Sequence, residues 1–383
     1  MARNSDLGAA KNAKKDEFYT QLSDIEKEMR YYRKHFKGKS VLCNCDDPFE
    51  SNFFKYFVLN FNRLGLKKLV ATCYSTSPIM GSQLRYYADV NGQMTFSLDG
   101  VPPLETNAKR PYKAVVTTVH DTTGDGGIDM FDVAELFRMG ENELTELQGD
   151  GDYRSDECLE LLREADIVVT NPPFSKFRDY VGTLMEYQKS FVIIGNVNAL
   201  KYKEIFPYVM SNQIWLGASI HSGDRAFFVP DDYPLDASGC GIDESTGRKY
   251  IRVKGVRWYT NLDMKQRHEE LILVKRYNEE SNPHYDNYDA IEVSKTADIP
   301  CDYAGIMGVP LTFFDKFNPD QFEIIWQASG NTRASAPTDV LDQLGYKPSK
   351  EDRGGCCLLN GKRTYDRIFI RNKNPESPNG GHL

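Results

Sequence analysis

The sequence predicts an α/β protein with an open, doubly wound and mostly parallel sheet. Short apolar runs at 40–45, 67–74, 167–169 and 190–197 are typical of buried strands, and segments with helical spacing lie between them. A strand, a tight turn and a helix over 40–64 form the first crossover unit of such a sheet. These features favour one large α/β body followed by a region of different character.

Length and composition are ordinary for a globular protein. The chain has 383 residues, of which 40% are hydrophobic and 27% charged. No apolar run approaches the roughly 20 residues that a membrane span needs, and the first residues lack the apolar core of a secretory signal. The eight cysteines show no paired metal-ligand spacing. We therefore expect a cytoplasmic protein with reduced thiols and no metal.

The charge pattern leaves room for a nucleic-acid partner. A net charge of −8 excludes a wholly basic nucleic-acid binder but not a local basic face. Residues 1–15 are polar and partly basic, so they form either a flexible arm that touches a polyanion or a solvated leader. Residues 248–276 and the tail are also rich in Lys and Arg.

The most informative stretch is Ala165–Phe174. Its strand must stop at Asn171-Pro172-Pro173-Phe174, because proline cannot continue a ladder. The Asn171 side-chain oxygen and the Pro172 carbonyl can both accept hydrogen bonds from one amino group, and Phe174 can stack on a planar base. An exocyclic amine held in this way is a target for methylation. The alternative is a simple turn with Phe174 in the core.

The chain resembles a known family at this stretch and beyond it. Asn171–Phe174 resembles the catalytic motif of S-adenosylmethionine-dependent amino-methyltransferases in its adenine-N6 form, and the text around it resembles the EcoRI-type adenine-specific DNA methyltransferases. The matching stretches run in one order: Lys15–Gln21, Cys43–Pro48, Ser51–Phe57, Leu64–Leu69, Gly149–Ser155, Asp166–Phe174, Tyr285–Ile291 and Gly305–Pro310.

The resemblance implies a methyltransferase-type fold and a complete reaction. The expected enzyme binds S-adenosylmethionine and double-stranded DNA, flips an adenine out and methylates its N6 atom, as a monomer of the restriction-modification, orphan or phage type. The catalytic residues would be Asn171, Pro172, Pro173 and Phe174. Alternatives are methylation of RNA adenine or of protein glutamine, or a non-catalytic DNA-binding relative.

The resemblance also assigns a cofactor site. Phe18-Tyr19-Thr20 would line the methionine end, or else only pack the predicted helix 17–36. Asp46 or Asp47 would hold the ammonium group, or else cap the following helix. The expected cofactor-binding residues are Phe18, Tyr19, Thr20, Asn44, Asp46, Asp47, Pro48, Tyr74, Asp152 and Asn171.

The predicted cofactor site departs from the usual methyltransferase pattern at the turn after the first strand and at the end of the second strand. Glu50, Ser51 and Asn52 stand where methyltransferases usually have glycines. The resemblance implies that Asp152, with Asp150 in reserve, accepts a hydrogen bond from the adenine amine of the cofactor; the alternative is a plain turn. No acid at the end of the second strand identifies a ribose ligand.

The domain plan follows from these assignments. We expect a flexible arm over 1–15, a catalytic domain over 16–217 with an insertion at about 76–147, and a disordered tail over 374–383. Residues 218–373 would hold an interleaved DNA target-recognition region and segments that return to the catalytic body. There we expect strands at 227–229, 250–253, 257–259 and 271–274, and a loop excursion over 327–357. The expected DNA contacts are Lys14, Lys15, Arg252, Lys254, Arg257 and Trp258, although Trp258 could equally be a core residue.

Asp121–Asp132 imitates a calcium-binding loop. It has acids at loop positions 1, 5, 9 and 12 and glycine at position 6, but Thr at position 3 and Asp rather than Glu at position 12. We favour the alternative, a glycine-rich turn whose aspartates cap the following helix.

Overall fold

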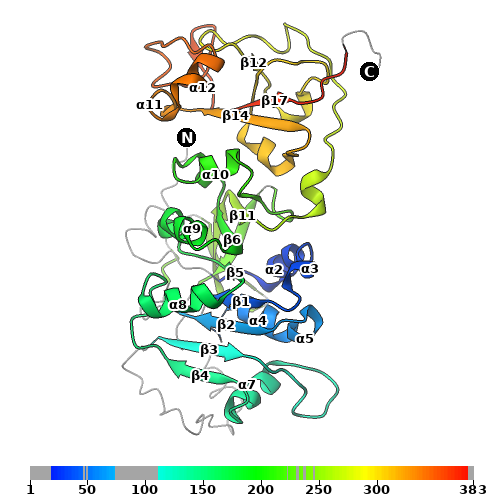
Figure 1. Cartoon of the computed structure of the whole chain (residues 1–383), viewed down its shortest axis with the longest axis vertical. Helices are drawn as coiled ribbons and strands as arrows, with labels where there is room; N and C mark the ends of the chain where they lie inside the picture. The colour runs from blue at the N-terminus through cyan, green and yellow to red at the C-terminus, as the bar shows by residue number, and fades with distance from the viewer. Residues whose placement is uncertain are drawn as a thin grey trace. The chain divides into compact units, whose positions relative to one another are not determined.

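The computed structural model describes residues 19–45, 48, 51–73, 111–221, 223–229, 233–235, 239–244 and 246–377 (Figure 1). The chain divides into two compact units. Unit 1 contains Met1–Ala199 and Ser222–Leu262, and unit 2 contains Leu200–His221 and Asp263–Leu383. In the part described, no helix is both long and apolar enough to cross a bilayer.

The large sheet of unit 1 has a parallel centre. Its strands lie in the order β4-β3-β2-β1-β5-β6-β11. The pairs β2–β1, β1–β5 and β5–β6 are parallel, and β3, β4 and β11 add antiparallel margins. The bounds are β1 Ser40–Cys43, β2 Lys68–Thr72, β3 Tyr112–Val116, β4 Glu143–Glu146, β5 Ile167–Thr170, β6 Ser190–Asn196 and β11 Val256–Thr260. The predicted α/β class with a largely parallel central sheet is therefore confirmed.

Apolar side chains explain why the central strands are buried. Every residue of β1 and β5 is buried, as expected for strands that are covered on both faces. Val41 shows the arrangement, because it pairs with Leu69 on one side and with Ile167 on the other.

The helices of unit 1 follow the predicted stripes but are shorter. The predicted helix 17–36 is broken at Tyr32, and the helix 52–64 is broken at Asn60, because both residues leave helical geometry. The apolar stripe itself is correct, since Ile25 and Phe36 are completely buried. The helices are α2 Leu22–Met29, α3 Arg33–Phe36, α4 Asn52–Leu59, α5 Phe61–Leu64, α7 Met130–Arg138, α8 Asp156–Glu164 and α9 Phe177–Glu186.

A small antiparallel sheet also belongs to unit 1. Its order is β8-β10-β9, with β8 Asp224–Phe228, β10 Lys249–Lys254 and β9 Cys240–Ile242. Tyr19 forms a bridge to Phe228 through two backbone hydrogen bonds of 3.0 and 3.1 Å. The segment before α2 is thereby attached to this sheet.

Unit 2 has its own sheet, in the order β12-β13-β17-β14. Phe369 and Ile370 of β17 and Phe313 are completely buried beside it. The strands of this sheet are β12 Ile291–Glu292, β13 Met307–Val309, β14 Phe322–Ala328 and β17 Arg367–Asn372. Unit 2 also contains the strands β7 Trp215–Leu216, β15 Leu358–Leu359 and β16 Lys362–Arg363 and the helices α10 Phe206–Met210, α11 Thr332–Ser335 and α12 Thr338–Gln343. The short 3-10 turns of the two units together are η1 Phe174–Lys176, η2 Val197–Lys201, η3 Lys265–His268, η4 Thr296–Asp298 and η5 Leu311–Lys316.

Several predicted boundaries need correction. Residues 271–274 are not a strand: Gln321 binds both backbone groups of Leu271, while Ile272 and Val274 are 84% and 78% exposed. Residues 327–357 are not a plain loop, because they contain α11 and α12. In the predicted insertion, residues 111–147 supply β3, α7 and β4 and so widen the sheet.

The Asp121–Asp132 loop has the capping geometry. Asp129 caps α7 by accepting from the backbone N–H of Phe131 at 2.7 Å and of Asp132 at 3.3 Å, and the Asp132 carboxylate accepts from the N–H of Asp129 at 2.9 Å. Asp121 accepts from the N–H groups of Gly124 and Gly126 at 2.6 and 2.8 Å. These carboxylates are thus engaged by the loop backbone itself.

Candidate active site

The Asn-Pro-Pro-Phe segment lies where the sequence predicts it, at the carboxyl end of β5. β5 is a central strand between β1 and β6. Asn171 is 7% exposed, Pro172 and Pro173 are buried, and half-buried Phe174 begins η1. The Pro173 carbonyl accepts from the N–H of Lys176 at 2.9 Å, which turns the chain into α9. The segment therefore occupies the edge at which open α/β sheets bind ligands.

The small sheet of unit 1 reaches this segment. The Phe174 ring meets the Phe227 ring of β8 edge to face, with centroids 6.4 Å apart. Phe227 lies on the inward face of β8 and is 2% exposed. Phe174 thus has an aromatic neighbour in β8, and the residue as a whole is half-buried.

The end of β1 adjoins the helix that follows the motif. Asn44 comes directly after β1 and is 4% exposed. Its side-chain oxygen accepts a hydrogen bond from the Tyr180 hydroxyl of α9. The Tyr153 ring packs edge to face on Tyr180 at 4.9 Å, and burial raises the pKa of the Tyr153 hydroxyl, which is therefore neutral. The end of β1, α9 and the loop before α8 come together here.

Asp152 connects that loop to the motif. Its carboxylate accepts two hydrogen bonds from the Arg154 guanidinium, at 3.0 and 2.8 Å, and lies 3.4 Å from the Lys176 ammonium of η1. The Arg154 hydrogen bonds, reinforced by the Lys176 charge and opposed by burial, hold the pKa of Asp152 well below its usual range. The sequence reasoning missed Arg154 and Lys176, although both stand inside or beside the motifs that carry the resemblance.

Gly151 brings the same loop against β2. Its φ is +75°, and a Cβ atom there would lie 2.1 Å from the Cys73 carbonyl oxygen and 2.9 Å from the Pro111 Cβ. Only glycine permits this approach without strain. The Gly149–Ser155 loop therefore contacts residues at the ends of β2 and β5 and packs on the helix that binds the end of β1.

Of the three residues at the usual glycine positions, Glu50 lies outside the described residues, and Ser51 and Asn52 have structural roles. The Ser51 hydroxyl caps α4 by accepting from the N–H of Phe53 at 3.1 Å. The Asn52 amide donates to the Thr20 carbonyl at 2.7 Å. Tyr19 and Thr20, 5% and 4% exposed, are thereby held between the start of α4 and β8.

Some expected site residues lie outside the described residues. They are Lys14, Lys15, Phe18, Asp46, Asp47 and Tyr74. Pro48, by contrast, is among the described residues and is buried.

The expected DNA contacts separate into two groups. Arg252 and Lys254 are exposed on one face of β10, while the alternating residues Ile251 and Val253 are buried on the other. Trp258 is 0% exposed and packs on Phe53 with ring centroids 5.9 Å apart. A side chain so completely buried is a core residue.

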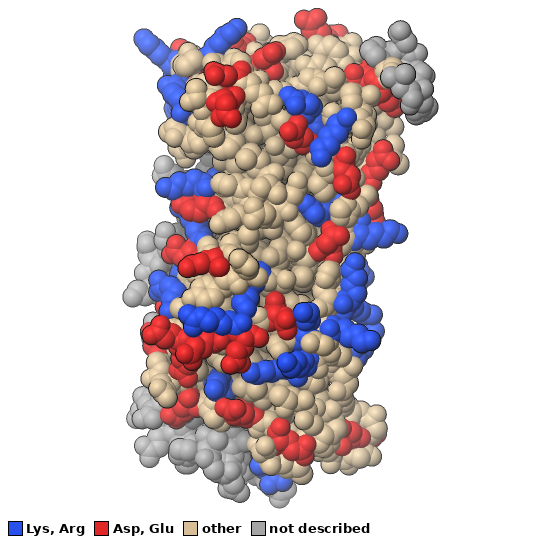
Figure 2. All heavy atoms as spheres, in the orientation of Figure 1, with Lys and Arg blue, Asp and Glu red and all other residues tan. Residues whose placement is uncertain are grey.

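Arg257, next to Trp258 in β11, is also buried. It is 4% exposed, and its guanidinium donates to the Val256 carbonyl at 2.9 Å. For Trp258 the core alternative therefore holds, and the expected DNA contact of Arg257 is not available to a side chain that is buried in this way. Acidic and basic side chains are mixed over the face that Figure 2 shows, rather than forming one broad basic field.

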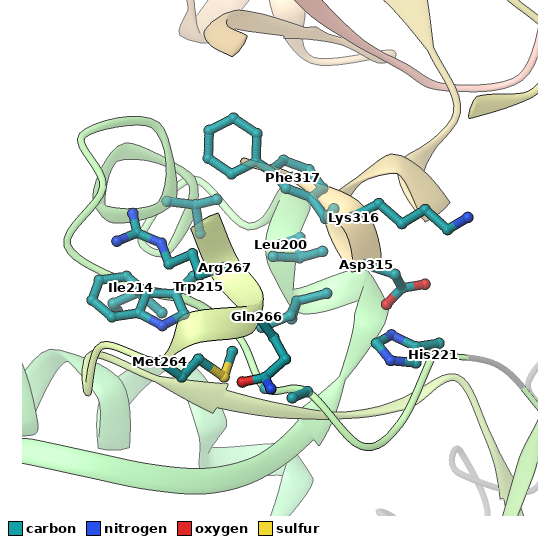
Figure 3. A pocket seen from close by; sticks show the side chains of 15 residues that line it. Leu200, Ile214, Trp215, His221, Met264, Gln266, Arg267, Asp315, Lys316 and Phe317 are labelled. Carbon is teal, nitrogen blue, oxygen red and sulfur yellow. The ribbon is translucent and has the colours of Figure 1, made fainter. Parts of the chain in front are cut away.

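A cavity in unit 2 is too small for the cofactor. Figure 3 shows that both apolar and polar side chains line it, among them Ile214, Met264 and Gln266. The Arg267 guanidinium lies 3.8 Å from the centroid of the Trp215 ring. Its volume is about 50 Å³, whereas pockets for small-molecule ligands hold several hundred Å³. This space fits ordered water.

Comparisons with known proteins identify the family of the chain. A family profile described as "Adenine-specific methyltransferase EcoRI" matches residues 6–373. Type II methyltransferase M.EcoRI of Escherichia coli is 43% identical over 378 residues, covering 97% of this chain and 99% of that protein. Type II methyltransferase M.MpnI of Mycoplasma pneumoniae is 36% identical over 367 residues, covering 95% and 97%. No solved structure matches the chain. The chain therefore belongs to the EcoRI family of adenine-specific DNA methyltransferases.

Proposed function

We propose that the chain transfers a methyl group from S-adenosylmethionine to N6 of an adenine flipped out of duplex DNA. The observation that carries this is the position of Asn171–Phe174 at the carboxyl end of β5, among parallel strands. The adenine amine is paired inside a duplex, so the base must leave the stack at a cost of a few kcal/mol. The extruded base would stack on the half-buried Phe174.

Asn171 and Pro172 supply the polar part of the chemistry. The Asn171 side-chain oxygen and the Pro172 carbonyl would accept the two N–H groups of the adenine amine. These hydrogen bonds would orient the nitrogen lone pair and favour the positive charge that N6 gains as its new bond to the methyl carbon forms. The carbon–sulfur bond breaks at the same time, and its electron pair leaves on the sulfur, which becomes the neutral thioether of S-adenosylhomocysteine. The nitrogen then releases a proton to water. No strong base is needed, because the cationic nitrogen is acidic.

The cofactor fits a set of buried hydroxyls in unit 1. S-adenosylmethionine supplies an electrophilic methyl group on a charged sulfur. The hydroxyls of Thr20, Thr72 and Tyr153 are buried without a hydrogen-bond partner among the described residues. Thr72 ends β2, Thr20 adjoins the start of α4, and Tyr153 follows Asp152. Since buried polar groups are normally paired, these hydroxyls favour a polar ligand with sugar and amino-acid parts.

The finer details of the fold, the domains and the DNA contacts are proposed together with this function. The sheet would be doubly wound, as in other methyltransferases, and 218–373 would contain the DNA target-recognition region. Arg252 and Lys254 of β10, both exposed, remain proposed phosphate contacts. One chain would carry every part of the reaction, so we expect it to act as a monomer.

Transfer of labelled methyl from S-adenosylmethionine tests this function. The purified protein is incubated with unmethylated duplex DNA, with RNA and with protein acceptors in parallel, and the products are digested. We expect the label in N6-methyladenine from duplex DNA. Label found only in RNA or in protein glutamine would refute the DNA substrate.

A further inference from the structure

Unit 2 carries a short exposed hairpin, residues 358–365, which we call the 358–365 hairpin. β15 and β16 pair antiparallel, with Leu358 opposite Arg363 and Leu359 opposite Lys362. The two connecting residues, Asn360 and Gly361, have φ of 51° and 72°. Two positive φ values at an Asn-Gly pair are typical of the tightest hairpin turn. The turn therefore fixes the positions of the two cations that follow it.

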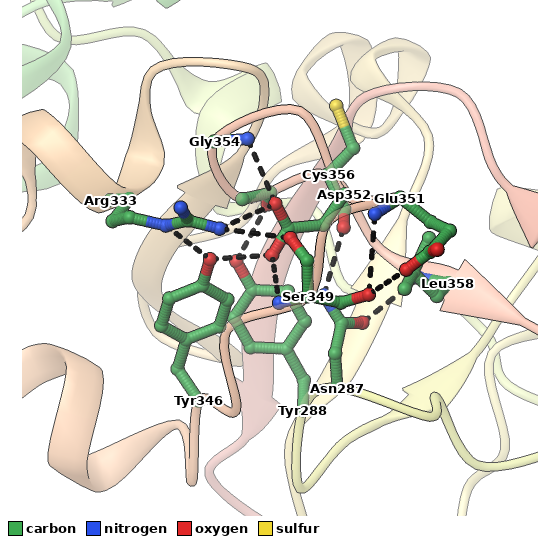
Figure 4. Close-up of polar contacts among 11 residues, drawn as sticks. Asn287, Tyr288, Arg333, Tyr346, Ser349, Glu351, Asp352, Gly354, Cys356 and Leu358 are labelled. Carbon is green, nitrogen blue, oxygen red and sulfur yellow. Dashed lines mark hydrogen bonds and ion pairs between the residues drawn. The ribbon is translucent and has the colours of Figure 1, made fainter. Parts of the chain in front are cut away.

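The hairpin is anchored at its tip and its base. The Asp286 carboxylate accepts from the N–H groups of Asn360 and Gly361 at 3.3 and 2.7 Å. Asn287 accepts from the N–H of Leu358 at 2.9 Å and donates to the Cys356 carbonyl at 3.0 Å (Figure 4). A two-stranded hairpin alone is marginally stable, so these bonds make it rigid.

The segment before the hairpin is rigid as well. Asp352 is 0% exposed and accepts from the Tyr346 hydroxyl at 2.6 Å and from Arg333 at 2.7 Å. Figure 4 shows this cluster beside Cys356 and Leu358. The hairpin is thus mounted on an ordered base.

Tyr365 projects from the end of the hairpin. Its side chain is 86% exposed, which makes it the most exposed of the large hydrophobic residues described. Its backbone is nevertheless held, because its carbonyl accepts from the Thr364 hydroxyl at 3.0 Å and from Arg367 at 3.4 Å. Arg367 is itself fixed by a buried ion pair with Glu292 at 2.6 Å. A fixed backbone with an exposed ring is an arrangement prepared for a partner.

The charge around Tyr365 indicates what the partner is. Lys362 and Arg363 are exposed and form no ion pair with any residue in the described ranges. Two acids of this region have other partners, since Asp286 binds the turn and Asp366 pairs with Lys201 at 2.6 Å. Two free cations beside an exposed aromatic ring fit a polyanion with planar bases.

We propose that the 358–365 hairpin binds the duplex substrate: Lys362 and Arg363 enter the major groove, and Tyr365 packs against a base or sugar. The major groove admits a two-stranded ribbon of this size. The inference rests on the proposed function, because duplex DNA is the partner it names. It assigns to unit 2 a set of contacts that determine where the enzyme binds.

Variants of exposed residues test the inference without disturbing the core. The full-length protein is titrated into a labelled duplex that the wild type methylates, at several salt concentrations. We expect K362A/R363A to weaken binding on the order of tenfold or more and to lower the slope of log affinity against log salt by about 2. We expect Y365A to weaken binding roughly tenfold, while Y365F, which keeps the ring, binds as the wild type.

A control pair separates this surface from general charge. K34A/K37A removes two exposed cations of α3 and the residue after it, and we expect no change in binding. S-adenosylmethionine binding and thermal unfolding should be unchanged in all of these variants. If K362A/R363A and Y365A bind like the control pair while the wild type methylates the duplex, the inference is wrong and the proposed function stands. If the wild type neither binds nor methylates any duplex, both are wrong.

Discussion

Replacing Gly151 by alanine should damage the candidate site through the addition of a single methyl group. Gly151 has a φ of +75°, and its added Cβ would lie 2.1 Å from the Cys73 carbonyl oxygen, a backbone atom that cannot swing away. An alanine in the left-handed region costs about 1–2 kcal/mol, and overpacking costs about 1–3 kcal/mol more. The expected loss is therefore about 2–5 kcal/mol of unfolding free energy.

Gly149 provides a matched control two residues away. A Cβ there meets nothing within 4 Å, and the residue does not have a positive φ. Urea unfolding should show a clearly lower midpoint for G151A and nearly the wild-type midpoint for G149A. Calorimetric titration with S-adenosylmethionine should show weaker binding for G151A, because the Asp152 loop is pushed away from β2.

Equal midpoints for the two variants would refute this reasoning. They would mean that the loop does not pack on the end of β2. The junction of β1, β2 and β5 proposed for the cofactor would then lose its main structural support.

Further predictions concern the core, the Asp152 ion pairs and the α7 cap. W258A should lower the unfolding free energy by about 3–5 kcal/mol, measured by urea unfolding, because Trp258 is a core residue; a loss of DNA affinity at unchanged stability would contradict this. Asp152 has a lowered folded-state pKa, so its pairing stabilises the protein above the unfolded value of about 3.9 and is lost as pH falls through the folded value. D152N should therefore be less stable than the wild type at pH 7, and the difference should shrink below about pH 4; a constant difference would count against the ion pairs. D129A should cost about 1 kcal/mol in thermal unfolding through loss of the α7 cap, and no change would exclude that cap.

The sequence predicted the sheet centre and the motif because their signals are local. A buried parallel strand requires a continuous apolar run, and β1, β2, β5 and β6 all have one. Prolines after such a run stop the strand, so the place of Asn171 could be predicted without coordinates. The polar residues Ser51 and Asn52 could be noticed, but their contacts with Phe53 and Thr20 could not.

The remaining features depend on contacts between distant parts of the chain. Residues 271–274 have strand composition, but Gln321 holds the backbone there and no neighbouring strand pairs with them among the described residues. Trp258 next to an arginine resembled a DNA contact until its packing on Phe53 was known. The pairing of Asp152 with Lys176 links residues 24 positions apart. Composition and spacing do not contain this information.

Single-turnover methyl transfer by N171A is the most direct test of the central claim. The same preparation is assayed for S-adenosylmethionine binding, duplex binding and helical content, so that chemistry is separated from folding. We predict that transfer to adenine N6 falls by about 100-fold or more, and by far more than either affinity, because a hydrogen-bond acceptor that acts mainly in the transition state is lost. Transfer by N171A at nearly the wild-type rate would contradict the account, and the methyl-accepting site would have to lie away from the end of β5.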